Sequence, residues 1–247
     1  MSTKNKHGLS RSIGSEVKRL IRQQCGFGCV ICCSSIWDYE HIDPTFENAT
    51  WHDAAAMALL CPNHHREVTS GRISKETVAS YRKSPCSLNR GEVGSNFDLG
   101  AKTPSLQFGG LHIQGCPIPI KVGPDPLFEV KGGEELGSPF RLSGNFYNSK
   151  GKLSLKITDN EWKVFSNEVW DLDIKGPVIT IRDKKNNISL RLKMDPPNGI
   201  IIEKLNMTLK NYTFIGGKDS LSIFRDGNNI GGFKNCLIKN CGVGMNL

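Results

Sequence analysis

The sequence predicts an α+β protein in which a small N-terminal domain is followed by a larger, mainly antiparallel β domain. Two observations predict this division. Six of the nine cysteines and five of the six histidines lie within residues 1–90, among short stretches with helical periodicity. From residue 140 onward, apolar and polar residues alternate between turn signals. We therefore expect domains at residues 1–90 and 140–247.

Composition and charge narrow the class of protein. Hydrophobic residues make up 38% of the chain and charged residues 23%, as in soluble globular proteins. The 32 Lys+Arg against 24 Asp+Glu give a net charge of +8. Residues 1–90 hold twelve basic and eight acidic side chains, so the excess is denser there. A basic surface attracts nucleic acid, and a charge that serves solubility alone is the alternative.

The clustering of the cysteines and the composition of the N-terminus indicate the cellular compartment of the protein. Cysteines clustered with histidines favour metal binding over disulfides, and hence a reducing compartment. Residues 1–13 are polar and basic, so we expect them to fray rather than to act as a signal peptide. No apolar run reaches the length of a membrane span. We expect a cytoplasmic protein with no membrane partner.

A metal site is predicted from two short motifs, C-x2-C at residues 29–32 and C-x2-H at residues 61–64. Three thiolates and one imidazole at this spacing are typical of a closed tetrahedral Zn²⁺ site that serves structure. The predicted ligands are Cys29, Cys32, Cys61 and His64. Cys25 and Cys33 lack the partner spacing and are expected to be ordinary small residues, with replacement of a ligand by one of them as the alternative.

The first helix is expected over residues 15–22, with Ser15 as its cap and an apolar side made by Val17, Leu20 and Ile21. Basic side chains would then lie on its outer side, where they contact either phosphate or solvent. The predicted nucleic-acid contacts are Lys18, Arg19, Arg22 and, later in the chain, Arg66.

Residues 36–42 are rich in β-forming residues and predict a strand or hairpin that ends at Asp43-Pro44. Glu40 and His41 therefore stand at a strand end. A loop follows over residues 45–57. Pro62 suits the first turn of a helix that ends at Gly71. A second helix is expected from a Ser74 cap to Arg82.

Helix geometry separates the two adjacent histidines. Each residue advances about 100° around the axis, so side chains three apart share a face and neighbours diverge. His64 should therefore join Cys61 at the zinc, while His65 points elsewhere.

Residues 91–139 are rich in Gly and Pro, which indicates a linker, an ordered loop or short strands. Strands are expected at residues 153–157, 178–181 and 188–192, and Trp162 is expected in the core. This pattern predicts a fold class without any chemistry. Regulation, target recognition and homo-oligomerisation are the roles open to the β domain.

With these residues in hand, residues 15–85 resemble the HNH endonucleases of the ββα-metal superfamily, and in particular the zinc-stapled members. The motifs that carry the resemblance are the C-x2-C pair, Glu40-His41-Ile42-Asp43-Pro44, and Leu60-Cys61-Pro62-Asn63-His64-His65. The resemblance implies a β-hairpin and a helix that hold one divalent ion and cut a phosphodiester bond.

The resemblance also implies roles for single residues. His41 matches the general base, and Glu40 and His65 match the ligands of a catalytic Mg²⁺ or Mn²⁺. The chain departs from the family at the middle asparagine, where Ala56 stands. Asn48 and His52 are candidates for the missing hydrogen bonds. We expect an endonuclease that acts on double-stranded DNA. The alternative is a non-catalytic zinc module that binds nucleic acid or a protein.

Overall fold

A computed structural model describes residues 4–247, and the chain divides into two compact units at Gly94. Helices make up 16% of the chain and strands 45%, and most strand pairs are antiparallel. The prediction of a mixed helix and strand protein with mainly antiparallel sheets is confirmed at this level. Within the described residues, no helix combines the length and the apolar character that crossing a bilayer requires.

The N-terminal unit holds four helices and one hairpin among its described residues. Its helices are α1 (Ser15–Gln24), α2 (Pro62–Thr69), α3 (Lys75–Lys83) and α4 (Cys86–Arg90). Strand β1 (Asp38–His41) pairs antiparallel with β2 (Met57–Leu60), which follows the short helix η1 (Ala54–Ala56). All four residues of β2 are buried. This strand is the centre of a core to which α1, α2 and α3 contribute Ile21, Val68 and Val78.

Local sequence signals place the helix ends near the site. Pro62 is the first residue of α2, where its missing N–H has no intrahelical partner to lose. Beyond the end of α2, Gly71 has a φ of 76°, which glycine adopts without strain. Ser74 caps α3, and its Oγ accepts from the Thr77 N–H at 3.1 Å. The N-cap of α1 is Gly14, so the prediction of a Ser15 cap is wrong.

Val17 and Ile21 of the predicted apolar side of α1 contribute to the core, but two other residues of the helix depart from the prediction. Arg22 is buried beside Ile21, whereas Leu20 is 44% exposed. The Arg22 guanidinium donates from Nη1 to the Tyr39 hydroxyl at 2.9 Å, which gives the buried charge a polar partner. The prediction that Arg22 lies on the outer side, ready for phosphate, is therefore wrong.

Residues 4–13 contact the rest of the N-terminal unit rather than fraying, and residues 1–3 of the segment predicted to fray lie outside the described residues. The Asn5 side chain donates to the carbonyl oxygens of Phe46 and Ala49, at 2.5 and 2.6 Å. Arg11 lies over the Phe46 ring, with 4.4 Å from Cζ to the ring centroid. These contacts hold the segment against the loop after β1. No local sequence pattern predicts them.

One disulfide joins Cys33 to Cys86. Their Cα atoms lie 5.2 Å apart, within the usual range for such a bond. The Cys86 N–H donates to the Val30 carbonyl at 3.0 Å, which brings the start of α4 to the turn that contains Cys33. The prediction of metal binding in place of disulfides is therefore wrong for this pair, and Cys33 is not a spare metal ligand.

The C-terminal unit consists of strands, apart from the short helix η2 (Ser166–Glu168). The chain enters it through β3 (Glu92–Asn96), within which the boundary of the units falls. The remaining strands are β4 (Ser105–Phe108), β5 (Leu111–Gln114), β6 (Ile118–Val122), β7 (Asp125–Lys131), β8 (Arg141–Tyr147), β9 (Leu153–Thr158), β10 (Glu161–Phe165), β11 (Asp171–Lys175), β12 (Val178–Lys184), β13 (Asn187–Asp195), β14 (Gly199–Leu209), β15 (Tyr212–Gly216), β16 (Leu221–Arg225), β17 (Asn228–Phe233), β18 (Cys236–Lys239) and β19 (Val243–Asn246).

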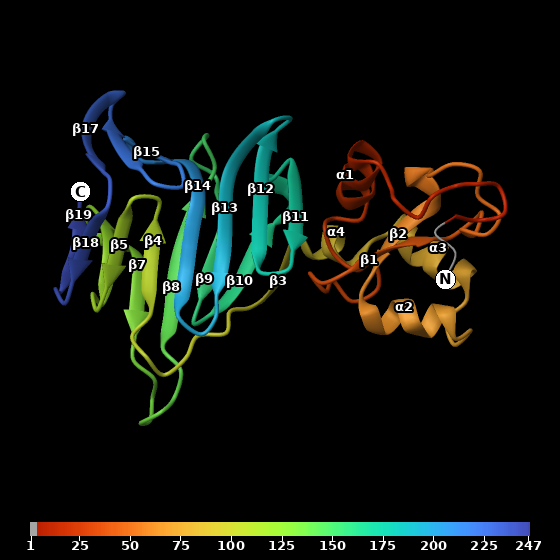
Figure 1. Ribbon diagram of the computed structural model, residues 1–247, viewed down its shortest axis with the longest axis horizontal. Helices are drawn as coiled ribbons and strands as arrows, with labels where there is room; N and C mark the ends of the chain where they lie inside the picture. The colour runs from red at the N-terminus through yellow and green to blue at the C-terminus, as the bar shows by residue number, and fades with distance from the viewer. Residues whose placement is uncertain (1–3) are drawn as a thin grey trace. The chain divides into compact units, whose positions relative to one another are not determined.

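These strands form two sheets. Strands β11 to β17 follow one another as a meander in the larger sheet, and β12, β13 and β14 lie side by side in Figure 1. The order of the smaller sheet is β19-β6-β7-β8-β9-β10-β3. The Phe108 ring of the larger sheet lies 5.0 Å from that of Phe128 in the smaller, so the sheets share a core. Trp162 is buried in it as expected, and residues 91–139 contribute β3 to β7.

Candidate metal centre and active site

Four predicted ligands meet at one point. The ligand atoms of Cys29, Cys32, Cys61 and His64 all lie within 4.8 Å of one another. The Cys32 and Cys61 sulfurs are 3.8 Å apart, and His64 Nδ1 lies 3.4 Å from Cys29 Sγ and 3.3 Å from Cys61 Sγ. Tetrahedral Zn²⁺ with bonds of about 2.3 Å to sulfur and about 2.0 Å to nitrogen requires edges of about 3.8 and 3.5 Å. The cluster therefore fits a metal ion such as zinc.

Backbone contacts build this cluster from distant parts of the chain. The Val30 N–H donates to the Leu59 carbonyl at 3.0 Å and so docks the C-x2-C turn onto β2. Cys61 is the N-cap of α2, which places His64 on the same side of the helix one turn later. A Cβ at Gly28 would lie 2.2 Å from Ser87 Oγ and 3.0 Å from the Cys33 carbonyl oxygen, so glycine allows the close packing before Cys29.

The thiols of this region differ in their surroundings. Desolvation, together with the neighbouring thiols of Cys29 and Cys61, raises the pKa of Cys32 to about 12. A bound cation is therefore needed for Cys32 to act as a thiolate at neutral pH. Cys25 is fully buried, and burial raises its pKa to about 11, as expected for a small core residue. Cys25 is not part of the cluster.

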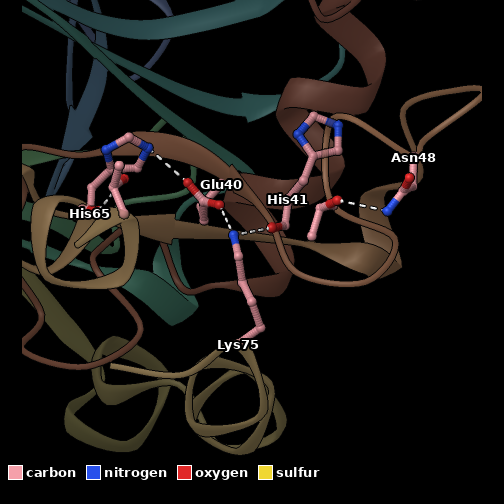
Figure 2. Close-up of polar contacts among 7 residues, drawn as sticks. Glu40, His41, Asn48, His65 and Lys75 are labelled. Atoms are coloured by element: carbon pink, nitrogen blue, oxygen red, sulfur yellow. Dashed lines mark hydrogen bonds and ion pairs between the residues drawn. The ribbon is translucent and has the colours of Figure 1, made fainter. Parts of the chain in front are cut away.

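A second polar group lies beside the Cys3His cluster. Glu40 on β1 and His65 on α2 meet with 2.7 Å between Oε2 and Nε2. The other Glu40 oxygen, Oε1, contacts the ammonium of Lys75, which also donates to the His41 carbonyl at 2.6 Å. Figure 2 shows the Glu40 carboxylate between His65 and Lys75. Sequence reasoning did not identify Lys75, since the first residue of a helix carries no signal for a contact 35 positions away.

Glu40 and His65 are spaced as two of the ligands of a divalent ion would be. Octahedral Mg²⁺ with bonds of about 2.1 Å places neighbouring ligands about 3 Å apart, close to the Glu40–His65 separation. The Glu40 side chain is only 13% exposed, so its charge is partly desolvated. Lys75 already contacts one of the two carboxylate oxygens. A divalent ion bound here would take one oxygen from Glu40 and one nitrogen from His65.

The His41 imidazole turns away from this pair. In Figure 2 its ring points to the opposite side of Glu40 from His65. Its Nε2 lies 3.1 Å from His52 Nδ1, and its ring centroid lies 5.4 Å from that of Phe46. His41 is 8% exposed. Burial lowers the pKa of His41, with His52 as the next cause and Lys75 and Arg11 adding to it, while Glu40 acts in the opposite direction.

Ala56, which stands where the family has its middle asparagine, makes a backbone hydrogen bond next to His41. Ala56 accepts from the Ile42 N–H at 2.8 Å through its carbonyl oxygen, next to His41. Of the two candidates for the missing hydrogen bonds, Asn48 instead contacts Thr45 Oγ1 at 3.3 Å and Lys6 Nζ at 2.6 Å. His52 contacts the His41 ring, so it is the candidate that the structure brings to the site.

The four residues predicted to contact nucleic acid differ in how exposed they are. Arg66 on α2 is exposed, one residue after His65. Lys18 is half-buried, with 5.6 Å from Nζ to the centroid of the Tyr39 ring. Arg19 is half-buried and pairs with Glu16 on the same helix. Arg66 is therefore the most accessible of the four.

Comparison with family models, with curated proteins and with solved structures gives no match for this chain.

Proposed function

We propose that the protein is a metal-dependent endonuclease of the HNH type that hydrolyses phosphodiester bonds, with double-stranded DNA as its substrate. The observation that carries this proposal is the meeting of Glu40 Oε2 and His65 Nε2 at 2.7 Å, next to the Cys3His cluster and one residue from His41. A zinc-binding module needs four ligands, and this carboxylate and these two imidazoles are additional to them.

Under this proposal the hairpin β1–β2 and helix α2 form the ββα element, and zinc at the cluster replaces a larger core. Glu40 and His65 hold Mg²⁺ or Mn²⁺, which when bound supplies positive charge to the scissile phosphate. His41 accepts a proton from the attacking water. A lowered pKa supports that role, because the imidazole must be neutral in order to accept. Arg66 contacts a neighbouring phosphate.

A second function, a zinc module that binds nucleic acid or protein without catalysis, is favoured by two specific contacts. The Lys75 ammonium satisfies Glu40 without a divalent ion, and the His41 ring faces His52 rather than the Glu40–His65 pair. Catalysis requires that Lys75 move off the Glu40 carboxylate or share it with the divalent ion. It also requires that the phosphate reach His41.

Nicking of supercoiled plasmid distinguishes the two functions. Zinc-loaded full-length protein is incubated with Mg²⁺ or with Mn²⁺, and wild type is compared with His41→Ala. His112→Ala serves as the control, since His112 lies on β5 in the other unit. The nuclease proposal expects nicking by wild type and by His112→Ala, and a loss of at least about a hundredfold in His41→Ala. Equal cleavage by all three, or none with either ion, contradicts it.

A further inference from the structure

Three polar groups form one hydrogen-bonded chain that ends at His41. His52 Nε2 lies 2.9 Å from the carbonyl oxygen of Ser10, and His52 Nδ1 lies 3.1 Å from His41 Nε2. The two imidazole centroids are 5.2 Å apart, with 45° between the ring planes. Both rings are therefore held edge to edge by their nitrogens.

The hydrogen bonds from Ser10 through His52 to His41 allow one consistent arrangement of protons when both rings are neutral. A carbonyl oxygen can only accept, so His52 Nε2 must carry the hydrogen that it donates to Ser10. A neutral imidazole has one N–H, so His52 Nδ1 carries a lone pair. His41 Nε2 must then be the donor, and its Nδ1 is left as the basic nitrogen.

We propose that His52 is a positioning residue that fixes the tautomer and orientation of His41, with the basic nitrogen of His41 at Nδ1. The inference rests on the proposed role of His41 as general base. His52 supplies a hydrogen-bond partner for His41, which the methyl group of Ala56 cannot do. A wrong tautomer presents an N–H where a lone pair is needed, so this hydrogen bond selects between a working base and an idle one.

The surroundings of His52 hold it in place. Ser10 belongs to the N-terminal segment, and the Asn5 side chain of that segment bonds to the carbonyls of Phe46 and Ala49 in the loop that carries His52. Arg11 lies over the Phe46 ring, which in turn packs against the His41 ring. The N-terminal segment therefore supports His52 and Phe46, two side chains that lie against the His41 ring.

The test is the nitrogen spectrum of the histidines in full-length, zinc-loaded protein with ¹⁵N-labelled histidine. Long-range proton–nitrogen correlation separates the protonated from the lone-pair nitrogen of each neutral ring. His41→Ala and His52→Phe identify the two sets of signals. His52→Phe keeps a ring without an acceptor, and His52→Asn keeps an acceptor close to the position of Nδ1. His112→Phe is the matched control.

The expected result is a wild-type His41 with its hydrogen on Nε2, unchanged in His112→Phe. In His52→Phe the His41 signals shift to a mixture of tautomers and kcat falls about 10–100-fold with KM and zinc content retained, while His52→Asn recovers the single tautomer and part of kcat. A wild-type hydrogen on Nδ1, or identical His41 signals in His52→Phe, overturns the inference. The spectrum is read without cleavage, so an inactive wild type would refute the proposed nuclease and leave this test intact.

Discussion

His64 and His65 are consecutive in the chain, yet their imidazoles meet different partners. His64 Nδ1 lies 3.3 Å from Cys61 Sγ within the metal cluster, whereas His65 Nε2 lies 2.7 Å from Glu40 Oε2 on β1. The rotation of about 100° between successive helical residues produces this separation. One helix, α2, thus contributes one side chain to a Cys3His group that could hold a metal ion and the next to a candidate reactive centre.

Removal of one zinc ligand should unfold the N-terminal unit. We expect about one zinc per chain in wild type and almost none in Cys61→Ser, because a structural site contributes most of the folding free energy of a small domain. Metal analysis and hydrogen exchange measure this. Exchange should rise across residues 4–94 and stay low in the strands of residues 95–247. Cys236→Ser, in the other unit, should keep its zinc. A Cys61→Ser protein with full zinc content would refute the assigned ligands.

Lys75 should compete with a divalent ion for Glu40. A divalent ion and an ammonium group about 4 Å apart near a protein surface repel by about 2–8 kcal/mol, so Lys75→Met should bind Mn²⁺ at least about tenfold more tightly. Paramagnetic resonance of Mn²⁺ titrated into zinc-loaded protein measures the affinity. Lys83→Met, on the same helix and exposed, is the control and should match wild type. Unchanged or weaker binding in Lys75→Met would contradict the competition.

The pH profile of cleavage should reflect the buried position of His41. Burial disfavours the imidazolium, so the pKa of His41 lies below its ordinary value of about 6.5. The base is neutral above its pKa, so kcat/KM should rise with pH, bend below pH 6.5 and stay flat through neutral pH. Rates across a pH series in Mg²⁺ test this. A bend at or above 6.5 would show that another group controls the rate.

The Cys33–Cys86 bond closes a loop over a sequence separation of 53 residues. In the chain-entropy account such a loop contributes about 4 kcal/mol, so the double variant Cys33→Ala/Cys86→Ala should lower the free energy of unfolding of the N-terminal unit by about 2–4 kcal/mol. Peptide mapping without reductant should recover Cys33 linked to Cys86. Alkylation of both thiols in unreduced protein would contradict the bond.

Local patterns predicted the parts of the site that depend on short spacings. The Cys3His cluster follows from two motifs with a spacing of three, and the starts of α2 and α3 follow from Pro62 and Ser74. The alternating patterns after residue 140 correspond to β9, β12 and β13. In each case the information lies within one turn of helix or one strand, where neighbouring residues determine the geometry.

The features that the sequence did not reveal depend on how elements dock. The burial of Arg22 depends on Tyr39, which is 17 positions away, and the Lys75 contact links residues 35 apart. His52 is one of two candidates from the sequence, but its docking on His41 depends on a loop that contacts the N-terminal segment. Cys33 meets Cys86 at a sequence separation of 53 residues. A single sequence has no periodicity that records such pairs.

The most direct test of the account is to locate two different metals in crystals of zinc-loaded protein soaked in Mn²⁺. Anomalous diffraction collected at the zinc edge and above the manganese edge separates the ions. We predict zinc among Cys29, Cys32, Cys61 and His64, and manganese bound by Glu40 and His65 with Lys75 displaced from the carboxylate. A single ion that takes both imidazoles, or manganese absent from Glu40 with Lys75 still in contact, would contradict the assignment of His64 and His65 to separate sites.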